Sequence, residues 1–267
     1  MRRNLFFLGV MSVGLIAFGC KKAAPTAFMR GLSMYYATPE GTYTWHSLGI
    51  EAVSPNYTPQ VNINGYVVPK ENISEGFANY SIDDTLPKVS PNTDLQVKVT
   101  YYDLNDSKKE ASANIKLAPE PAGFSLSITS GQVNVAWAQV DPKAVSFIGV
   151  FVDASCLDAD YNYQYAQWDT ILTDVQEATS ISLTLGTLCD EIGDPVAARV
   201  EAAVMNGVGP WSGAKDNLKG IVGQYYGGTI RSDTASWVAS TTYTLPEYPN
   251  LDINSLLRRV KGLLGEW

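Results

Sequence analysis

The sequence predicts an all-β fold of two antiparallel sandwiches in a row, followed by a short C-terminal amphipathic helix. Three observations support this. Tyrosine, valine, threonine and serine are abundant, and these residues favour strands over helices. Short runs of alternating apolar and polar residues recur between turn residues. A proline-bearing segment, residues 119–122, separates two such strand-rich regions and is expected to be a stiff linker.

The first sandwich is expected over residues 28–118. Its clearest strand is 95–101, where every second residue is apolar, namely Leu95, Val97, Val99 and Tyr101. Residues 111–117 alternate again after a turn, so the two segments are expected to form a hairpin. The same alternation appears over residues 43–53 and 60–68. Short strands at this spacing are typical of an antiparallel sandwich.

The second sandwich is expected over residues 123–226, and its motifs resemble those of a fibronectin type III domain. VNVAW, residues 133–137, resembles strand B of that family, with Trp137 in the core. Residues 180–188 are similar to its strand E, and NGVGPWS, residues 206–212, resembles its F–G turn. The resemblance implies two tandem immunoglobulin-like or fibronectin type III-like β-sandwiches.

A C-terminal extension is expected over residues 227–267, and it contains an amphipathic helix. Apolar residues recur there at helical spacing: Ile253, Leu256, Leu257, Val260, Leu263, Leu264 and Trp267. Arg258, Arg259 and Lys261 fall on the polar side. A basic amphipathic helix of this kind packs on its own domain, lies on a membrane or docks on a partner, and the sequence leaves all three destinations open.

The N-terminus reads as an export signal, residues 1–19. Two arginines precede an apolar run, residues 5–17, which is too short to span a bilayer but suits the apolar region of a secretory signal. IAFGC, residues 16–20, resembles the lipobox of bacterial lipoproteins. The resemblance implies cleavage before Cys20 and acylation of its amino-terminal end. The alternatives are an ordinary signal peptide cut nearby and an uncleaved anchor.

Lipidation would make residues 20–27 a tether. Two or three acyl chains would hold the chain on a membrane, because each buried methylene contributes about 0.8 kcal/mol. Lys21 and Lys22 follow the cysteine, and by resemblance this implies the outer membrane of a two-membrane bacterium. The expected localisation is therefore extracytoplasmic and lipid-anchored, with the periplasmic and cell-surface faces both open.

Charge argues against nucleic acid as a partner. The formal net charge is −8, and loss of Arg2 and Arg3 with the signal makes it about −10. Such a chain repels phosphate backbones, and no basic cluster with interleaved aromatic residues offsets the repulsion.

Two cysteines remain, Cys156 and Cys189, and an exported compartment favours a disulfide between them. A two-cysteine metal site is the rival interpretation. The single histidine, His46, lies far away in the sequence, so a zinc site is not expected. In the fibronectin-like topology the loops after strands C and E lie at one pole of the sandwich, which implies that the two cysteines can meet. No cofactor is expected.

The segment DADYNYQYAQWD, residues 158–169, is the leading candidate for a binding surface. If it is extended, Tyr161, Tyr163 and Tyr165 share one face. Such a strip stacks on sugar rings or receives a protein partner. With Trp168 it would form a carbohydrate-binding platform. The alternative is that the tyrosines cover the sandwich core or shield a sheet edge.

The same segment has the spacing of a calcium loop. Asp158, Asp160 and Asn162 match the first ligands, and Asp169 stands where the last ligand would be. Tyr163 occupies the position at which the tight turn needs glycine, so the match is weak and solvated loop acids are the alternative.

Catalytic motifs are not recognised. His46 is the single candidate base for Ser-His-Asp or Cys-His chemistry, and no glycine-rich phosphate loop is present. The expected function is therefore that of a membrane-anchored, extracytoplasmic, non-catalytic module that binds a protein partner of the cell envelope. The alternatives are a carbohydrate-binding module and a subunit of a larger envelope assembly in which the tail helix docks.

Overall fold

A computed structural model describes residues 25–138, 145–172, 179–207 and 217–239. These residues form strands with almost no helix, so the predicted all-β class is confirmed. Cys20, the F–G turn of the NGVGPWS motif and the C-terminal helix expected over 253–267 lie outside the described residues. None of the helices in the described part of the chain is long and apolar enough to cross a membrane.

The strands form three sheets. The largest has the order β12-β11-β14-β15-β1-β2-β6-β5, and the smaller two have the orders β4-β3-β7-β8 and β13-β10-β9. The elements are β1 (Phe28–Thr38), β2 (Gly41–Glu51), β3 (Gln60–Ile63), β4 (Tyr66–Val67), the 3₁₀ turn η1 (Lys70–Asn72), β5 (Ile73–Gly76), β6 (Asn79–Asp84), β7 (Asp94–Tyr102), β8 (Lys108–Lys116), β9 (Ala122–Thr129), β10 (Gln132–Ala138), β11 (Val145–Leu157), β12 (Tyr163–Leu172), β13 (Ser180–Thr184), α1 (Leu185–Cys189), β14 (Asp194–Gly207) and β15 (Val222–Val238).

The first core lies between β4-β3-β7-β8 and the β1, β2 and β6 part of the large sheet. The alternation expected over 95–101 is present in β7, whose apolar residues are all buried. They meet Leu48, Ile50 and Ile82 of the large sheet within one cluster. The hairpin expected with 111–117 is β7–β8, and the segment 60–68 is the β3–β4 hairpin.

The second core lies between β13-β10-β9 and the β11 and β14 part of the large sheet. Val133, Val135 and Trp137 of β10 face Ile148, Val150 and Val200 across it. Trp137 is buried, as the resemblance to strand B implies. Residues 185–189, read as the end of a strand and its following leucine, instead form the short helix α1, with Leu185 and Cys189 buried.

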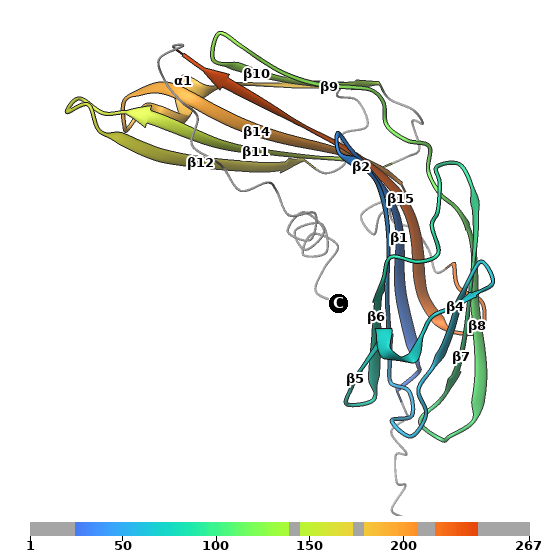
Figure 1. Cartoon of the computed structure of the whole chain (residues 1–267). Coiled ribbons are helices and arrows are strands. Elements are labelled where there is room, and N and C mark those ends of the chain that lie inside the picture. Colours follow the sequence, from blue (N-terminus) through green and yellow to red (C-terminus); the bar gives the residue numbers. More distant parts are fainter. Residues whose placement is uncertain (1–24, 139–144, 173–178, 208–216, 240–267) are drawn as a thin grey trace, which may run out of the picture.

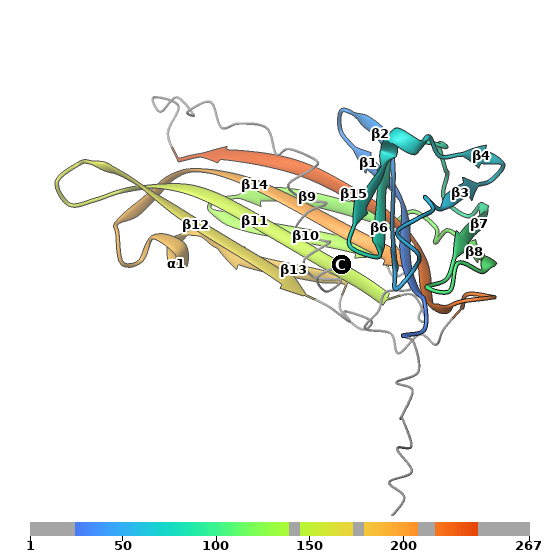
Figure 2. The ribbon, with the colours of Figure 1, turned by 90° about the horizontal axis from the view of Figure 1, so that it is seen from below.

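One strand, β15, belongs to both halves of the molecule. Its first part pairs parallel with β1, from Phe28↔Val222 to Ala37↔Arg231, and its second part pairs antiparallel with β14. Figures 1 and 2 show β15 running through the bend at which the two arms meet. The boundary expected at residue 226 therefore falls inside a strand. Gly227 and Gly228, the first residues of the expected C-terminal extension, lie buried at this crossing.

The segment expected as a linker lies against this crossing. The carbonyl oxygen of Pro119 accepts hydrogen bonds from Thr229 Oγ1 at 2.7 Å and from Asn206 Nδ2 at 3.3 Å. Glu120 forms an ion pair with Arg231 at 3.0 Å. Residues 119–122 are thus held on β14 and β15 by polar contacts.

A buried chain of hydrogen bonds joins β15, β1 and β2. Ser33 Oγ lies 2.8 Å from the Tyr225 hydroxyl and 2.7 Å from His46 Nδ1, and all three residues are fully buried. His46 Nε2 lies 2.8 Å from the carbonyl oxygen of Pro87. Because a carbonyl only accepts, Nε2 carries the proton, Nδ1 accepts from Ser33, and Ser33 accepts from Tyr225.

Gly31 makes room for the Tyr225 ring that this chain positions. A Cβ at Gly31 would overlap Cδ2 and Cε2 of that ring, which is fully buried and held by Ser33. We expect Gly31→Ala to lower the free energy of unfolding by about 1–3 kcal/mol, the usual cost of overpacking a core. Gly49→Ala on β2 is the matched control, because no heavy atom lies within 4 Å of its added Cβ. Denaturant unfolding of both variants checks this, and equal losses would contradict it.

Acid should weaken the buried chain at His46. Burial lowers the pKa of the imidazole below its ordinary value of 6.5; the bond to Pro87 and nearby Asp84 oppose the shift, and Lys88 adds to it. Below pH 6.5 the unfolded chain therefore binds a proton that the folded chain resists, so stability is full above that pH and falls as pH drops through it. Unfolding midpoints at pH 7.5 and 5.5 measure the slope, which should be flatter in His46→Gln. An unchanged slope in that variant would exclude His46 as the cause.

Candidate functional site

The β11–β12 hairpin projects beyond the rest of its arm and carries the tyrosines singled out from the sequence (Figures 1 and 2). Leu157 pairs with Tyr163, and residues 158–162 form the turn. The amide of Asp158 donates to the carbonyl of Asn162 at 3.0 Å, and the amide of Tyr161 donates to the carbonyl of Asp158 at 3.0 Å. The turn is therefore closed by its own backbone.

The Asp158 carboxylate completes this turn. Its Oδ1 accepts from the amide of Asn162 at 2.7 Å and from the amide of Asp160 at 2.9 Å. The bond from the Asn162 amide is the main cause that lowers the Asp158 pKa below its ordinary value, with further contributions from Asp160 and from the side chains of Asn162 and Gln164. Asp158 is thus held as an anion by local donors, as aspartate is in many turns.

The structure separates the four residues of the calcium interpretation. Asp169 pairs with Phe151 in the middle of the hairpin, six residues beyond Tyr163, which is about 20 Å along a strand. It cannot share an ion with Asp158, Asp160 and Asn162 in the turn. Across the residues that the structure describes, no group of three or more His, Cys, Asp or Glu side chains is placed to hold a metal. The spacing matched because a turn capped by aspartate and a calcium loop both begin with closely spaced oxygen-bearing side chains.

The three tyrosines are exposed at this tip. Their exposed fractions are 82% for Tyr161, 54% for Tyr163 and 65% for Tyr165. Tyr163 and Tyr165 lie on one face of β12, and Tyr161 stands in the turn with a positive φ of 63°. The tyrosines therefore do not cover the sandwich core. They form a surface that we call the tip tyrosines.

Trp168 lies on the other face of β12. It is partly buried and packs against the second core, as does Ala166. The reason is the period of a strand: within β12, positions 163 and 165 differ from 168 by odd numbers, so the side chains of Tyr163 and Tyr165 lie on the opposite face from Trp168. The structure keeps Tyr163 and Tyr165 on one exposed face, next to the turn that carries Tyr161, and leaves Trp168 out of that surface.

A disulfide joins Cys156 and Cys189, in agreement with the expected pairing, with 5.7 Å between the two Cα atoms. Cys189 ends α1, while Cys156 lies within β11, rather than in a loop after it, and pairs with Gln164. The disulfide therefore attaches the hairpin to α1 one residue before the end of β11, next to the turn at the tip. It restrains the element that presents the tyrosines.

A groove of about 520 Å³ lies at the opposite end of the other arm, where β1 begins. Pro25, Thr26 and Ala27 line one wall, and the β7–β8 turn with Leu104 lines another. Residues 220–222, just before and at the start of β15, complete it. The chain thus enters the fold through this groove.

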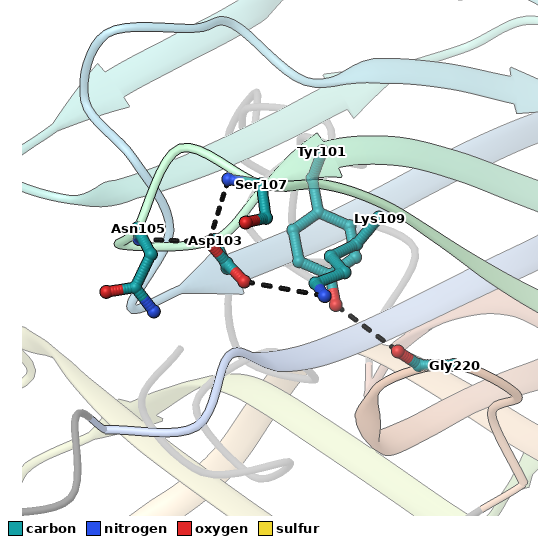
Figure 3. Close-up of polar contacts among 6 residues, drawn as sticks. All are labelled: Tyr101, Asp103, Asn105, Ser107, Lys109 and Gly220. Atoms are coloured by element: carbon teal, nitrogen blue, oxygen red, sulfur yellow. Dashed lines mark hydrogen bonds and ion pairs between the residues drawn. The ribbon is translucent and has the colours of Figure 1, made fainter.

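The polar groups of the groove are paired with one another (Figure 3). Asp103 accepts from the amides of Ser107 at 3.0 Å and Asn105 at 2.9 Å, and Lys109 Nζ lies 3.7 Å from its Oδ2. These donors, with Ser107 the largest cause, lower the Asp103 pKa. The Tyr101 hydroxyl donates to the carbonyl of Gly220 at 3.2 Å, and burial raises the Tyr101 pKa. The arrangement braces a turn against the start of β15.

His46, the one candidate base of the chain, is fully buried, and both its ring nitrogens are engaged by Ser33 and Pro87. Its proximity to a serine hydroxyl resembles a catalytic pair. No substrate can reach it, however, and the serine hydroxyl is itself the acceptor for Tyr225. The contact is structural.

Sequence reasoning missed a set of exposed apolar residues near the groove, of which Phe77 is the clearest. Phe77 is 95% exposed and occupies a two-residue turn between Gly76 and Asn79, which pair with each other. Turns of this length normally carry glycine, asparagine or aspartate. An aromatic residue in such a turn was the signal that could have identified it.

Comparisons with known proteins assign no family to this chain, since no family model and no curated protein matches it. Among solved structures, it is similar to the dimeric latent PorU of Porphyromonas gingivalis over 79% of this chain, with 7% identity and a TM-score of 0.24. The chain covers 19% of that structure. A likeness of this size carries no argument about function.

The stability of the tip turn should depend on the Asp158 carboxylate and not on calcium. We expect Asp158→Ala to lower the melting temperature, because the amides of Asp160 and Asn162 lose their acceptor, and Asp158→Asn to restore most of the loss. Calcium should leave the melting temperature of the unsubstituted chain unchanged. A calcium-dependent rise that EGTA reverses would contradict our assignment of the carboxylate to the turn.

Proposed function

We propose that this protein is a lipid-anchored, extracytoplasmic binding module of a bacterial cell envelope, without catalytic activity, which engages a protein partner through the tip tyrosines. The observation that carries the proposal is the display of three exposed tyrosines on a projecting hairpin that is braced by a disulfide. Tyrosine offers a large apolar area with a polar tip at low entropic cost, and it is enriched where proteins bind one another.

The order of the strands supports two tandem immunoglobulin-like or fibronectin type III-like sandwiches as the architecture. In the second half, three strands, β13-β10-β9, face four strands, β12-β11-β14-β15, around a closed core. That arrangement and the buried Trp137 are what the fibronectin resemblance implies. The first half has its own core between β4-β3-β7-β8 and the β1, β2 and β6 strands.

Acylation of Cys20 and an outer-membrane location are part of the proposal and rest on the lipobox-like residues 16–20. β1 begins at the free end of one arm, and the β11–β12 turn lies at the free end of the other (Figure 1). An anchored molecule would thus hold its binding surface away from the membrane.

The buried position of His46 supports a non-catalytic role, because acyl-transfer and hydrolytic chemistry by Ser-His or Cys-His groups needs a reachable base. The polar groups of the groove likewise serve a turn, as Asp103 shows.

Binding of a protein partner should depend on the tip tyrosines. A photoreactive amino acid at Asn162 in intact cells should crosslink one protein, and replacing Tyr161, Tyr163 and Tyr165 by serine should reduce the yield at least about tenfold, as expected for the loss of several interface aromatics. Tyr43→Ser is the matched control, since Tyr43 is an exposed tyrosine of β2 far from the tip. It should leave the yield unchanged.

The same variants distinguish the proposed protein-binding function from a second candidate, a carbohydrate-binding module. The exposed tyrosine face also favours that second function. Glycan binding that the serine variants abolish, with no protein crosslinked, would favour that function and contradict ours. A crosslink yield that survives the loss of all three tyrosines would contradict their role, because other residues would then hold the partner, as in a larger assembly held by residues 253–267.

A further inference from the structure

Four exposed apolar residues cluster at the groove end of the molecule. We call them the basal rim: Tyr57, Phe77, Leu104 and Val222, with exposed fractions of 43%, 95%, 38% and 44%. Each comes from a different segment of the chain. Exposed apolar side chains are common singly, but four that converge on one end from separate segments indicate a contact surface.

The strand registers place Val222 and Phe77 at this end. Phe28, the first residue of β1, pairs with Val222 on one side and with Glu51 on the other. Glu51 in turn pairs with Asn79, which closes the turn that carries Phe77. A single row of strand ends therefore runs from Val222 to Phe77.

Loop contacts add Leu104 and Tyr57 to the same end. Val53, two residues beyond the end of β2, bridges to Asp103, the neighbour of Leu104. Its amide also donates to the carbonyl of Ala78, the neighbour of Phe77, at 3.1 Å. The Tyr57 ring stacks on Tyr102 with 4.1 Å between centroids, next to the same turn.

The tether reaches the fold at this rim. Pro25 and Ala27 share the groove with Leu104 and Val222. Cys20 precedes Pro25 by five residues, and a chain of that length spans at most about 18 Å when fully extended. If Cys20 is acylated, the rim cannot move far from the lipid surface, so this step rests on the proposed anchor.

The charges near the rim indicate which kind of lipid surface the rim contacts. Glu51 and Glu75 are exposed beside the Phe77 turn, and Asp106 lies in the Leu104 turn. Two exposed basic residues lie at the same end, Arg30 over the Phe28 ring and Lys108, which pairs with Tyr102, and the tether carries Lys21 and Lys22. The acidic and basic groups largely offset one another, so an anionic membrane has no net attraction for this end. Apolar and aromatic side chains without a basic cluster suit a lipid interface that carries no net charge.

We propose that the basal rim rests on a zwitterionic lipid surface, with Phe77 and Leu104 inserted at the level of the headgroups. The fold then stands on the membrane at a defined angle instead of swinging on its tether. Phe77 is the deepest contact because it is the most exposed of the four and occupies the tip of its turn.

The test is quenching of a fluorophore by spin-labelled phosphatidylcholine. The full chain, purified from cells and reconstituted in phosphatidylcholine vesicles, would carry the label at Phe77→Cys, Leu104→Cys or, as control, Tyr43→Cys. Tyr43 matches Leu104 in exposure, at 38%, and lies eight residues up β2 from Glu51, about 27 Å away. Cys156 and Cys189 are bonded to each other, and the unsubstituted chain corrects for any label at Cys20.

We expect the quencher to remove about half of the emission from positions 77 and 104, as for groups at the headgroup boundary, and almost none from position 43. Replacing phosphatidylcholine with an anionic lipid should not strengthen the effect, because the charges near the rim largely offset one another. Equal quenching by lipid at the three positions would overturn the proposal. Self-quenching between labels at position 77 without quenching by lipid would also overturn it, because a second copy would then occupy the rim.

Mass spectrometry of the same preparation separates this proposal from the proposed anchor. If Cys20 carries acyl chains and position 77 is not quenched, the anchor stands and the rim proposal fails. If Cys20 is unmodified, the anchor fails. Quenching of position 77 on mixing with vesicles would then still support lipid contact by the rim, and its absence would exclude it.

Discussion

The rest of the structure depends on one constraint, the pairing of β15 with strands from both halves of the chain. Residues Gly228–Arg231 have a partner in β1 on one side and in β14 on the other. Separating the arms would leave buried backbone groups without hydrogen bonds, which is costly. The contacts of Pro119 and Glu120 with the same stretch add to this, so the angle between the arms is set by a continuous ladder and not by a linker.

The polar chain from Tyr225 to Pro87 ties the same strand to its neighbours inside the first half. Each buried donor in it has an acceptor when His46 is neutral, so the network costs little as long as the histidine carries no charge. Tyr225 reaches Ser33 only because Gly31 leaves space for its ring. A strand pair that joins residues nearly two hundred positions apart in the sequence is thus specified by one missing side chain and one buried hydroxyl.

Features that depend on local periodicity could be predicted from the sequence, and those that depend on distant pairing could not. Alternation identified β7 and the exposed face of Tyr163 and Tyr165, because a period of two is a property of a single strand. The parallel pairing of β1 with β15 leaves no local signal. The C-terminal extension is expected from residue 227, yet Gly227 and Gly228 lie inside β15, because glycine also serves where buried backbones approach closely. Trp168 was grouped with the tyrosines by proximity, when its odd offset already placed it on the other face.

The course of β15 also determines how the fold would carry mechanical load. In the proposed arrangement, with an anchor at Cys20 and a partner at the tip tyrosines, tension would enter through the start of β1 and leave through β11 and its neighbours. The ten registered pairs between β1 and β15 lie roughly along that line, so their hydrogen bonds, which run across the strands, bear the load together in shear rather than opening one at a time. Resistance to such a pull depends on the rate of unfolding under force. Because β15 is shared, the two arms would unfold across one common barrier.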